Sequence, residues 1–330
     1  MLESAVRDVT TRLVRITRYF GLVLTHPPSL GYLRRLANTL ADGLPSDLML
    51  GSKQASRPPL AGVIAPTTVK GPLVARILPR VLIGLFLVLA AFIMLTLLTS
   101  PAYASAGGID FRIYRDAAAR WLAGGFFYYP SQIAGPYETL IGHVMYPPVA
   151  LVLFVPFTIL PAVLWWILPL GATAWCVIAL RPSVWGWAII AACLAWPFSI
   201  DRLYTGNPTI WIVAFMALGT RCRWASALVL LKPSLVPFAL FGVRNRSWWL
   251  AVAAFSLVSV LFLPMWFDWI HVILNARGFF SGPLYSLLDI PIMMIPVVAW
   301  WTGQARRSAR QDSGQLEDQR RTNTSPSASE

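Results

Sequence analysis

The segment Val81–Thr99 carries no charged residue, and its length matches one crossing of a lipid bilayer. A helix needs ~20 consecutive apolar residues to cross the hydrocarbon core. The whole chain is 57% hydrophobic and 12% charged, whereas about a quarter of the residues in a typical soluble domain are charged. We therefore expect an integral membrane protein.

Six further apolar stretches follow this first one. They are Val149–Leu180, Val184–Ile200, Pro208–Gly219, Trp224–Val243, Trp248–Trp266 and Leu284–Trp301. The Leu160-Pro161 break predicts that Val149–Leu180 forms two short helices joined by a tight turn, because proline interrupts a helix. The sequence thus predicts an all-α polytopic membrane protein with a bundle of about eight transmembrane helices.

Three regions are expected along the chain. Residues 1–73 form a basic cytoplasmic leader, with a helix-spaced apolar stripe from Val6 to Val23 and a Pro/Gly linker over 51–72. The stripe suits a helix on an anionic membrane surface or one docked on the protein's own cytoplasmic face. Residues 74–302 form the transmembrane domain, and the polar residues 303–330 form a disordered cytoplasmic tail.

Arginines near the ends of the apolar segments set the expected orientation. Arg76 and Arg80 precede the first segment and Arg306 follows the last, which predicts cytoplasmic N- and C-termini in the cell membrane. The loop 100–146 then faces outward. Arg221 and Arg223 also fall outside, against the positive-inside rule, so Ser226–Phe241 is alternatively a re-entrant hairpin.

Several functional classes lack support in the sequence. The formal net charge of +13 is concentrated at the two ends of the chain, which suits orientation and anionic lipid contact rather than nucleic-acid binding. The three cysteines lack metal-ligand spacing, and no glycine-rich nucleotide cradle occurs. We expect membrane lipids as partners and no metal or other cofactor. The sequence contains no signal for a divalent-cation requirement or for an oligomeric state.

The outward loop opens with an amphipathic helical pattern over Asp110–Leu122. Arg112, Asp116 and Arg120 recur every four residues and are predicted to pair along one face. Asp110 has no local cation, and the apolar stripe beside it predicts a helix lying at the outer membrane interface. Asp110 suits an N-cap, a role compatible with that of a general base.

Aromatic residues follow in the same loop. Tyr128, Tyr129 and Tyr146 suit either a membrane interface or contact with sugar rings. Tyr146-Pro147-Pro148 predicts a helix start, because proline is tolerated in a first turn. The interface reading is the simpler one for each tyrosine alone.

Lys232 lies within the apolar segment ALVLLKPSLVPFAL. A cation at the centre of a span costs ~2.5–3.5 kcal/mol on the insertion scale, so it faces a cavity or a partner, or else it snorkels to an interface. Pro233 is expected to push Lys232 out of helical geometry. Asp201 and Arg202 suit a local salt bridge or a cavity lining, and Asp289 has no obvious partner.

The chain contains, in this order, IDFRIYRDAAARWLAGGFFYYP, HVMYPPVALVLFVPFTILP, YTGNPTIWIVAF and ALVLLKPSLVPFALFGVRNRSWW. This set, over about Leu82–Phe262, resembles glycosyltransferase family 87, the polyprenol-phosphate-sugar-dependent transferases of the GT-C superfamily. Two departures are the missing Gln before Asn207, where the family reads Gly-Gln-x-Asn, and a shorter C-terminal half. They leave open a reduced acceptor site or a divergent, inactive relative.

The resemblance implies a GT-C-like fold and an inverting sugar transfer on the outer face, from a polyprenyl-phosphate donor to a glycolipid or polysaccharide hydroxyl, with mannose favoured over arabinose. It implies Asp110 as the general base and Lys232 with Arg202 at the donor phosphate. The residues expected to shape the substrate site are Tyr114, Arg115, Tyr128, Tyr129, Tyr146 and Asn207. The competing hypotheses are an accessory subunit without catalysis and a lipid transporter or flippase, the latter disfavoured by the lack of an internal repeat.

Overall fold

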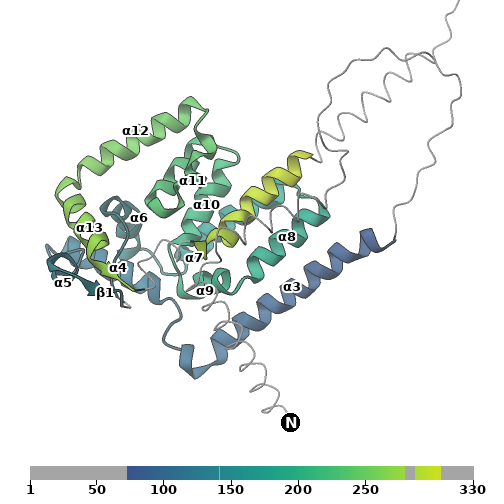
Figure 1. Cartoon of the computed structure of the whole chain (residues 1–330), viewed down its shortest axis with the longest axis horizontal. Helices are drawn as coiled ribbons and strands as arrows, with labels where there is room; N and C mark the ends of the chain where they lie inside the picture. Colours follow the sequence, from purple (N-terminus) through teal and green to yellow (C-terminus); the bar gives the residue numbers. More distant parts are fainter. Residues whose placement is uncertain (1–72, 141, 279–286, 306–330) are drawn as a thin grey trace, which may run out of the picture. The chain divides into compact units, whose positions relative to one another are not determined.

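The computed structural model describes residues 73–140, 142–278 and 287–305, which are mostly helical (Figure 1). These residues belong to one compact unit, Val69–Glu330. The predicted leader helix, the linker and most of the tail lie outside the described residues, so those predictions stay untested.

Helix α3 (Leu73–Thr99) is the one described helix that is long and apolar enough to cross a membrane by itself. Two bent pairs pass the same test when each is taken as one span: α8 (Val184–Ala195) with α9 (Pro197–Thr205), bent by 63°, and α12 (Arg246–Val260) with α13 (Leu263–Asn275), bent by 92°. The described residues therefore contain one to three candidate spans. The predicted count of about eight is not confirmed.

Shorter apolar helices fill most of the other predicted segments. Val149–Leu180 is divided as expected: the structure has a short helical stretch, Pro148–Thr158, and then α7 (Leu164–Leu180). Helix α10 (Thr209–Gly219) packs against α7, and a last helix, Ile290–Ala305, ends the described chain (unlabelled and yellow in Figure 1).

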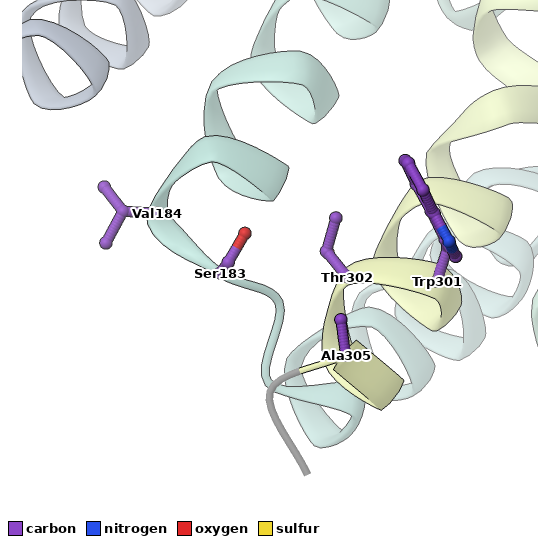
Figure 2. A pocket seen from close by; sticks show the side chains of 5 residues that line it. All are labelled: Ser183, Val184, Trp301, Thr302 and Ala305. Atoms are coloured by element: carbon purple, nitrogen blue, oxygen red, sulfur yellow. The ribbon is translucent and has the colours of Figure 1, made fainter. Parts of the chain in front are cut away.

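The last helix runs antiparallel to α8. A Cβ added to Gly186, near the start of α8, would lie 2.3 Å from the Thr302 hydroxyl, so this end of the last helix lies directly against α8. A pocket lined by Ser183, Val184, Trp301, Thr302 and Ala305 lies at the same place (Figure 2). At its other end, the last helix begins after Asp289, which contacts Arg202 of α9. We call the Thr302 end the basal end and the Asp289 end the polar end.

The segment around Lys232 forms a hairpin instead of one straight span. The 3-10 helix η5 (Arg223–Leu231) leads to Lys232, and η6 (Pro233–Leu235), α11 (Val236–Ala239) and η7 (Leu240–Gly242) return from it. A Cβ on Gly242 would lie 2.4 Å from the carbonyl oxygen of Arg223, so the two ends of the hairpin touch. The straight span predicted over Trp224–Val243 is wrong, and the re-entrant alternative matches the observed chain path. Lys232 is non-helical (φ −123°, ψ 88°), as expected for a residue before proline.

The chain path of the hairpin places two arginines beside α7 and the last helix. The Arg221 guanidinium lies 4.4 Å from the ring centroid of Trp175, in the last turns of α7, and Arg223 lies over Phe241 and near Trp300 of the last helix. Both arginines are therefore at the basal end, far along the hairpin from Lys232.

The predicted outward loop folds into a small helical layer that α13 covers. It contains α4 (Ile109–Leu122), α5 (Pro130–Ala134) and β1 (Tyr137–Glu138), which pairs in parallel with β2 (Ala276–Arg277). Trp269 of α13 donates to the Met145 carbonyl (3.0 Å), and Asn275 donates to the Ile133 carbonyl (2.9 Å).

Helix α4 exists as predicted, but its apolar face packs into the protein. Its buried residues are Phe111, Tyr114, Ala117 and Ala118, whereas the apolar stripe expected from the sequence is Ile109, Ile113, Ala117 and Trp121. Phe111 contacts Trp165 and Trp166 of α7 at ring-centroid distances of 5.4 Å each. This aromatic core positions the start of α4.

We predict that Cys222 and Arg277 lie on opposite sides of the membrane. Cys222 is exposed and adjoins the basal arginines, whereas Arg277 follows α13 beside the outward loop. In a variant with Cys176→Ala and Cys193→Ala, a membrane-impermeant maleimide should label Cys222 only after cells are permeabilised. Arg277→Cys, added to a Cys222→Ala version of that variant, should be labelled in intact cells. Labelling of both positions from the same side would contradict the hairpin topology.

Candidate active site

Asp110 lies in the first turn of α4 and is held by two side chains from a distant segment. Its Oδ2 accepts hydrogen bonds from the Asn207 amide (2.7 Å) and the Thr205 hydroxyl (3.0 Å). The N-cap is Gly108, with φ +66°, so the prediction of Asp110 as the N-cap is wrong. Its side chain points to the turn after α9 instead of capping its own helix.

The turn after α9 exists because Gly206 takes a left-handed conformation (φ +70°, ψ 36°). A Cβ at this position would lie 2.6 Å from the Trp166 ring and 3.1 Å from Phe111 Cβ. The carbonyl of Gly206 accepts a 2.8 Å hydrogen bond from the Trp165 indole. Backbone freedom and close packing together require glycine here, and the turn places Asn207 opposite Asp110.

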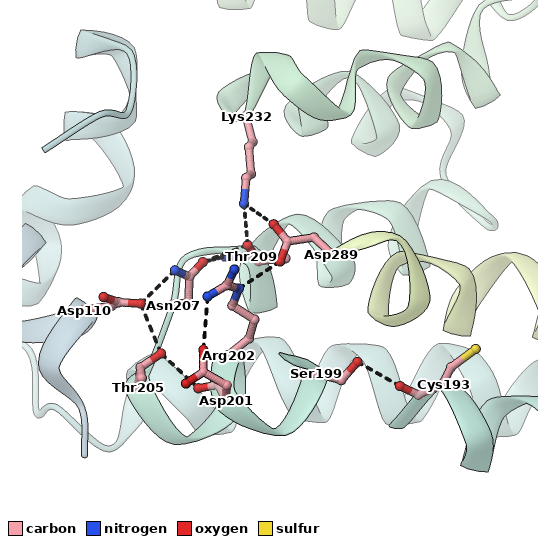
Figure 3. Close-up of polar contacts among 10 residues, drawn as sticks. All are labelled: Asp110, Cys193, Ser199, Asp201, Arg202, Thr205, Asn207, Thr209, Lys232 and Asp289. Carbon is pink, nitrogen blue, oxygen red and sulfur yellow. Dashed lines mark hydrogen bonds and ion pairs between the residues drawn. The ribbon is translucent and has the colours of Figure 1, made fainter. Parts of the chain in front are cut away.

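A hydrogen-bond chain continues from Asn207 to Lys232 (Figure 3). Asn207 Oδ1 accepts from the backbone N–H of Thr209 (3.0 Å) and from its hydroxyl (2.7 Å). The Lys232 ammonium donates to the same Thr209 hydroxyl at 2.8 Å. Asp110 and Lys232 are therefore joined through two intervening side chains, despite their distance along the chain.

Lys232 is not the solitary cation that the sequence suggests. Its Nζ lies 2.5 Å from Asp289 Oδ2, and the other oxygen of Asp289 contacts Arg202 Nε at 2.8 Å. Arg202 also pairs with Asp201 at 3.1 Å, the local salt bridge that the sequence predicts. Asp289 has no exposed surface, and the two cations compensate its buried charge. The sequence signal was an acidic residue within the last apolar segment, without any hint of its partners.

The predicted tyrosines divide into two groups. Tyr146 lies beside the site, with the Lys232 ammonium 6.0 Å from its ring centroid, and Tyr114 packs edge-on against it at 5.2 Å. The buried Tyr146 hydroxyl is near Thr209 but makes no hydrogen bond within the described residues. Tyr128 supports this wall from behind, because its hydroxyl donates to the Tyr146 carbonyl (2.8 Å), and burial raises the pKa of Tyr128.

Two other residues that were expected to shape the substrate site make their contacts away from it. Tyr129 stacks against the Arg120 guanidinium (4.6 Å), and Arg115 pairs with Asp116 (2.9 Å). The predicted pairing of Asp116 with Arg112 and Arg120 is therefore wrong, because Arg112 instead donates to the Gly107 and Ser105 carbonyls of the preceding turn. Asp110 forms no ion pair with any described residue, as its sequence surroundings predict.

Within the described ranges, no three His, Cys, Asp or Glu residues are arranged to hold a metal ion. His143 accepts a hydrogen bond from the Leu140 N–H (3.1 Å), and burial lowers the pKa of its imidazole.

No protein-family model, curated protein or solved structure matches this chain.

Gly206→Ala should destabilise the protein. The left-handed backbone alone costs ~1–2 kcal/mol for a residue with a Cβ, and the contact with Trp166 adds to that cost. The measurement is thermal unfolding in detergent, with tryptophan fluorescence as the signal. The matched control is Gly171→Ala within α7, where a Cβ meets nothing within 4 Å; an equal loss in both variants would contradict the role assigned to Gly206.

Asp289→Asn should lower the free energy of unfolding by ~3–5 kcal/mol, because it leaves two buried cations without their shared carboxylate. Asp116→Asn removes one partner of an exposed ion pair and should cost at most ~1 kcal/mol. Denaturant unfolding in mixed micelles compares the two. Similar values for both variants would show that Asp289 is not the centre of the cluster.

Proposed function

We propose that the protein is an integral-membrane glycosyltransferase that moves a sugar from a polyprenyl phosphate to a hydroxyl of a glycolipid or polysaccharide. The observation that carries this proposal is the connected polar site: a partly exposed carboxylate, Asp110, and a largely buried ammonium, Lys232, belong to one hydrogen-bond chain. A general base and a phosphate-binding cation in one site are the parts that such a transfer requires.

Asp110 has a geometry suited to a general base. Both of its side-chain hydrogen bonds fall on Oδ2, and Oδ1 has no partner among the described residues. Oδ1 would take the proton of the acceptor hydroxyl while the hydroxyl oxygen attacks the anomeric carbon. The carbon–oxygen bond to the phosphate then breaks, and the polyprenyl phosphate leaves with inversion at the sugar.

Lys232 is assigned to the donor phosphate and Arg202 to its support. The Lys232 side chain is 12% exposed, whereas that of Arg202 is 4% exposed and binds two carboxylates. A phosphate would share the Lys232 ammonium with Asp289, and the charge on the leaving oxygen would grow as the bond breaks. Tyr146 and Tyr114 form the adjoining aromatic wall, which suits a sugar ring. The donor sugar is proposed to be mannose rather than arabinose on the sequence resemblance alone.

The polar end is proposed to face outward, with both chain termini in the cytoplasm. The arginines at the basal end, Arg221 and Arg223, support this orientation under the positive-inside rule. The hairpin then enters from the cytoplasmic side and carries Lys232 up to the outer half of the protein. A lipid-linked donor in the outer leaflet would reach the site from the side.

One observation favours a second candidate, a non-catalytic accessory protein. The Lys232 charge is already balanced by Asp289, and the cluster of Asp110, Asp201, Asp289, Arg202 and Lys232 carries one more formal negative than positive charge. A resting cluster of this kind needs no ligand. Turnover of a labelled donor separates the two candidates.

Asp110→Asn should reduce sugar transfer by about 10²–10⁴-fold, because the amide cannot take the proton of the acceptor. The assay measures release of radiolabelled sugar from a panel of polyprenyl-phosphate donors by the purified protein. Asp116→Asn, on the same helix but paired with Arg115 at the surface, should retain turnover. Wild-type rates in Asp110→Asn would remove Asp110 from the mechanism, and no release by the wild-type protein with any donor would favour the accessory role.

A further inference from the structure

Each hydrogen bond between Lys232 and Asp110 has one possible direction. An ammonium only donates, so the Thr209 oxygen must accept from Lys232. The Thr209 hydroxyl proton is then directed to Asn207 Oδ1, which also accepts from the Thr209 backbone N–H. With its oxygen fixed in this way, the Asn207 amide presents its NH₂ group to Asp110. The Lys232 ammonium, the Thr209 backbone N–H and the Asp110 carboxylate therefore all favour the same orientation of an amide that the ammonium does not touch.

Burial protects this arrangement from exchange with water. Thr209 has no exposed surface, and Asn207 is 7% exposed. Asp289 also pairs with the Lys232 ammonium, so an ion pair holds the cation beside Thr209. In a buried chain of this kind each hydrogen bond polarises the next.

We propose that Thr209 is a positioning residue: its hydroxyl, aimed by Lys232, adds to the hold of its backbone N–H on Asn207 Oδ1 and so keeps the Asn207 amide on Oδ2 of Asp110. Asn207 occupies Oδ2 with Thr205, and Oδ1 is left for the acceptor hydroxyl. This inference rests on the proposed function for its catalytic meaning, while the orientation of Asn207 can be measured without turnover. Thr209 contacts neither Asp110 nor the reacting atoms, so its effect passes through Asn207.

The decisive pair of variants is Thr209→Val and Thr209→Ser. Valine keeps the shape but removes the hydroxyl, whereas serine keeps the hydroxyl. We expect Thr209→Val to lower kcat about 10²-fold with KM for the donor and the acceptor unchanged, as for a misoriented catalytic group. Thr209→Ser should stay within about threefold of the wild-type kcat, given that the hydrogen-bonding group is retained.

A second readout follows the side-chain amide of Asn207 in protein labelled with ¹⁵N-asparagine, assigned by loss of its signal in Asn207→Asp. The signal should shift in Thr209→Val and keep its position in Thr209→Ser. Lys232→Met, which removes the ammonium that orients Thr209, should shift it as well and serves if Thr209→Val does not fold. An unchanged signal in both Thr209→Val and Lys232→Met overturns the proposal, as does wild-type kcat in folded Thr209→Val. If the wild-type protein transfers no sugar but the signal responds as expected, the positioning role stands and the proposed reaction fails.

Discussion

The carboxylate of Asp289 is the interaction on which the polar end of this protein depends. It lies without solvent contact between the ammonium of Lys232 and the guanidinium of Arg202, and it stands at the start of the last helix. Three elements that are far apart in the chain, α9, the hairpin and the last helix, are therefore joined by one charge. Removal of a partner from such a cluster leaves a buried ion uncompensated, which costs far more than a surface pair.

The groups of the site gather where regular helix is interrupted. Gly206 ends α9 in a left-handed turn, Pro233 follows the non-helical Lys232, and Asp289 precedes the last helix. A helix interior satisfies its own backbone and presents few polar atoms, whereas a break frees side chains and backbone groups to meet. The aromatic core of Phe111, Trp165 and Trp166 packs against the break after α9, and two indole N–H groups donate to carbonyls of the α9 end.

Local signals in the sequence predict local structure well. The helix over Asp110–Leu122, the break at Leu160-Pro161 and the non-helical Lys232 all follow from spacing and from proline geometry, and the structure confirms them. The Asp116 pairing fails because i+4 spacing permits a pair without requiring it: Arg112 finds closer carbonyl acceptors in the turn before α4. The partners of Lys232 are not predictable in this way, since Asp289 belongs to another apolar segment and no periodicity links the two. The number of spans is equally inaccessible, because hydropathy does not distinguish a hairpin from a crossing of the same length.

A structure determined in lipid nanodiscs with bound polyprenyl phosphate tests the central claim most directly. The account predicts a phosphate oxygen within hydrogen-bond distance of Lys232 Nζ, with open space for a sugar between that phosphate and Asp110. A lipid phosphate bound away from Lys232, or packed side chains filling the space between Lys232 and Asp110, would contradict it.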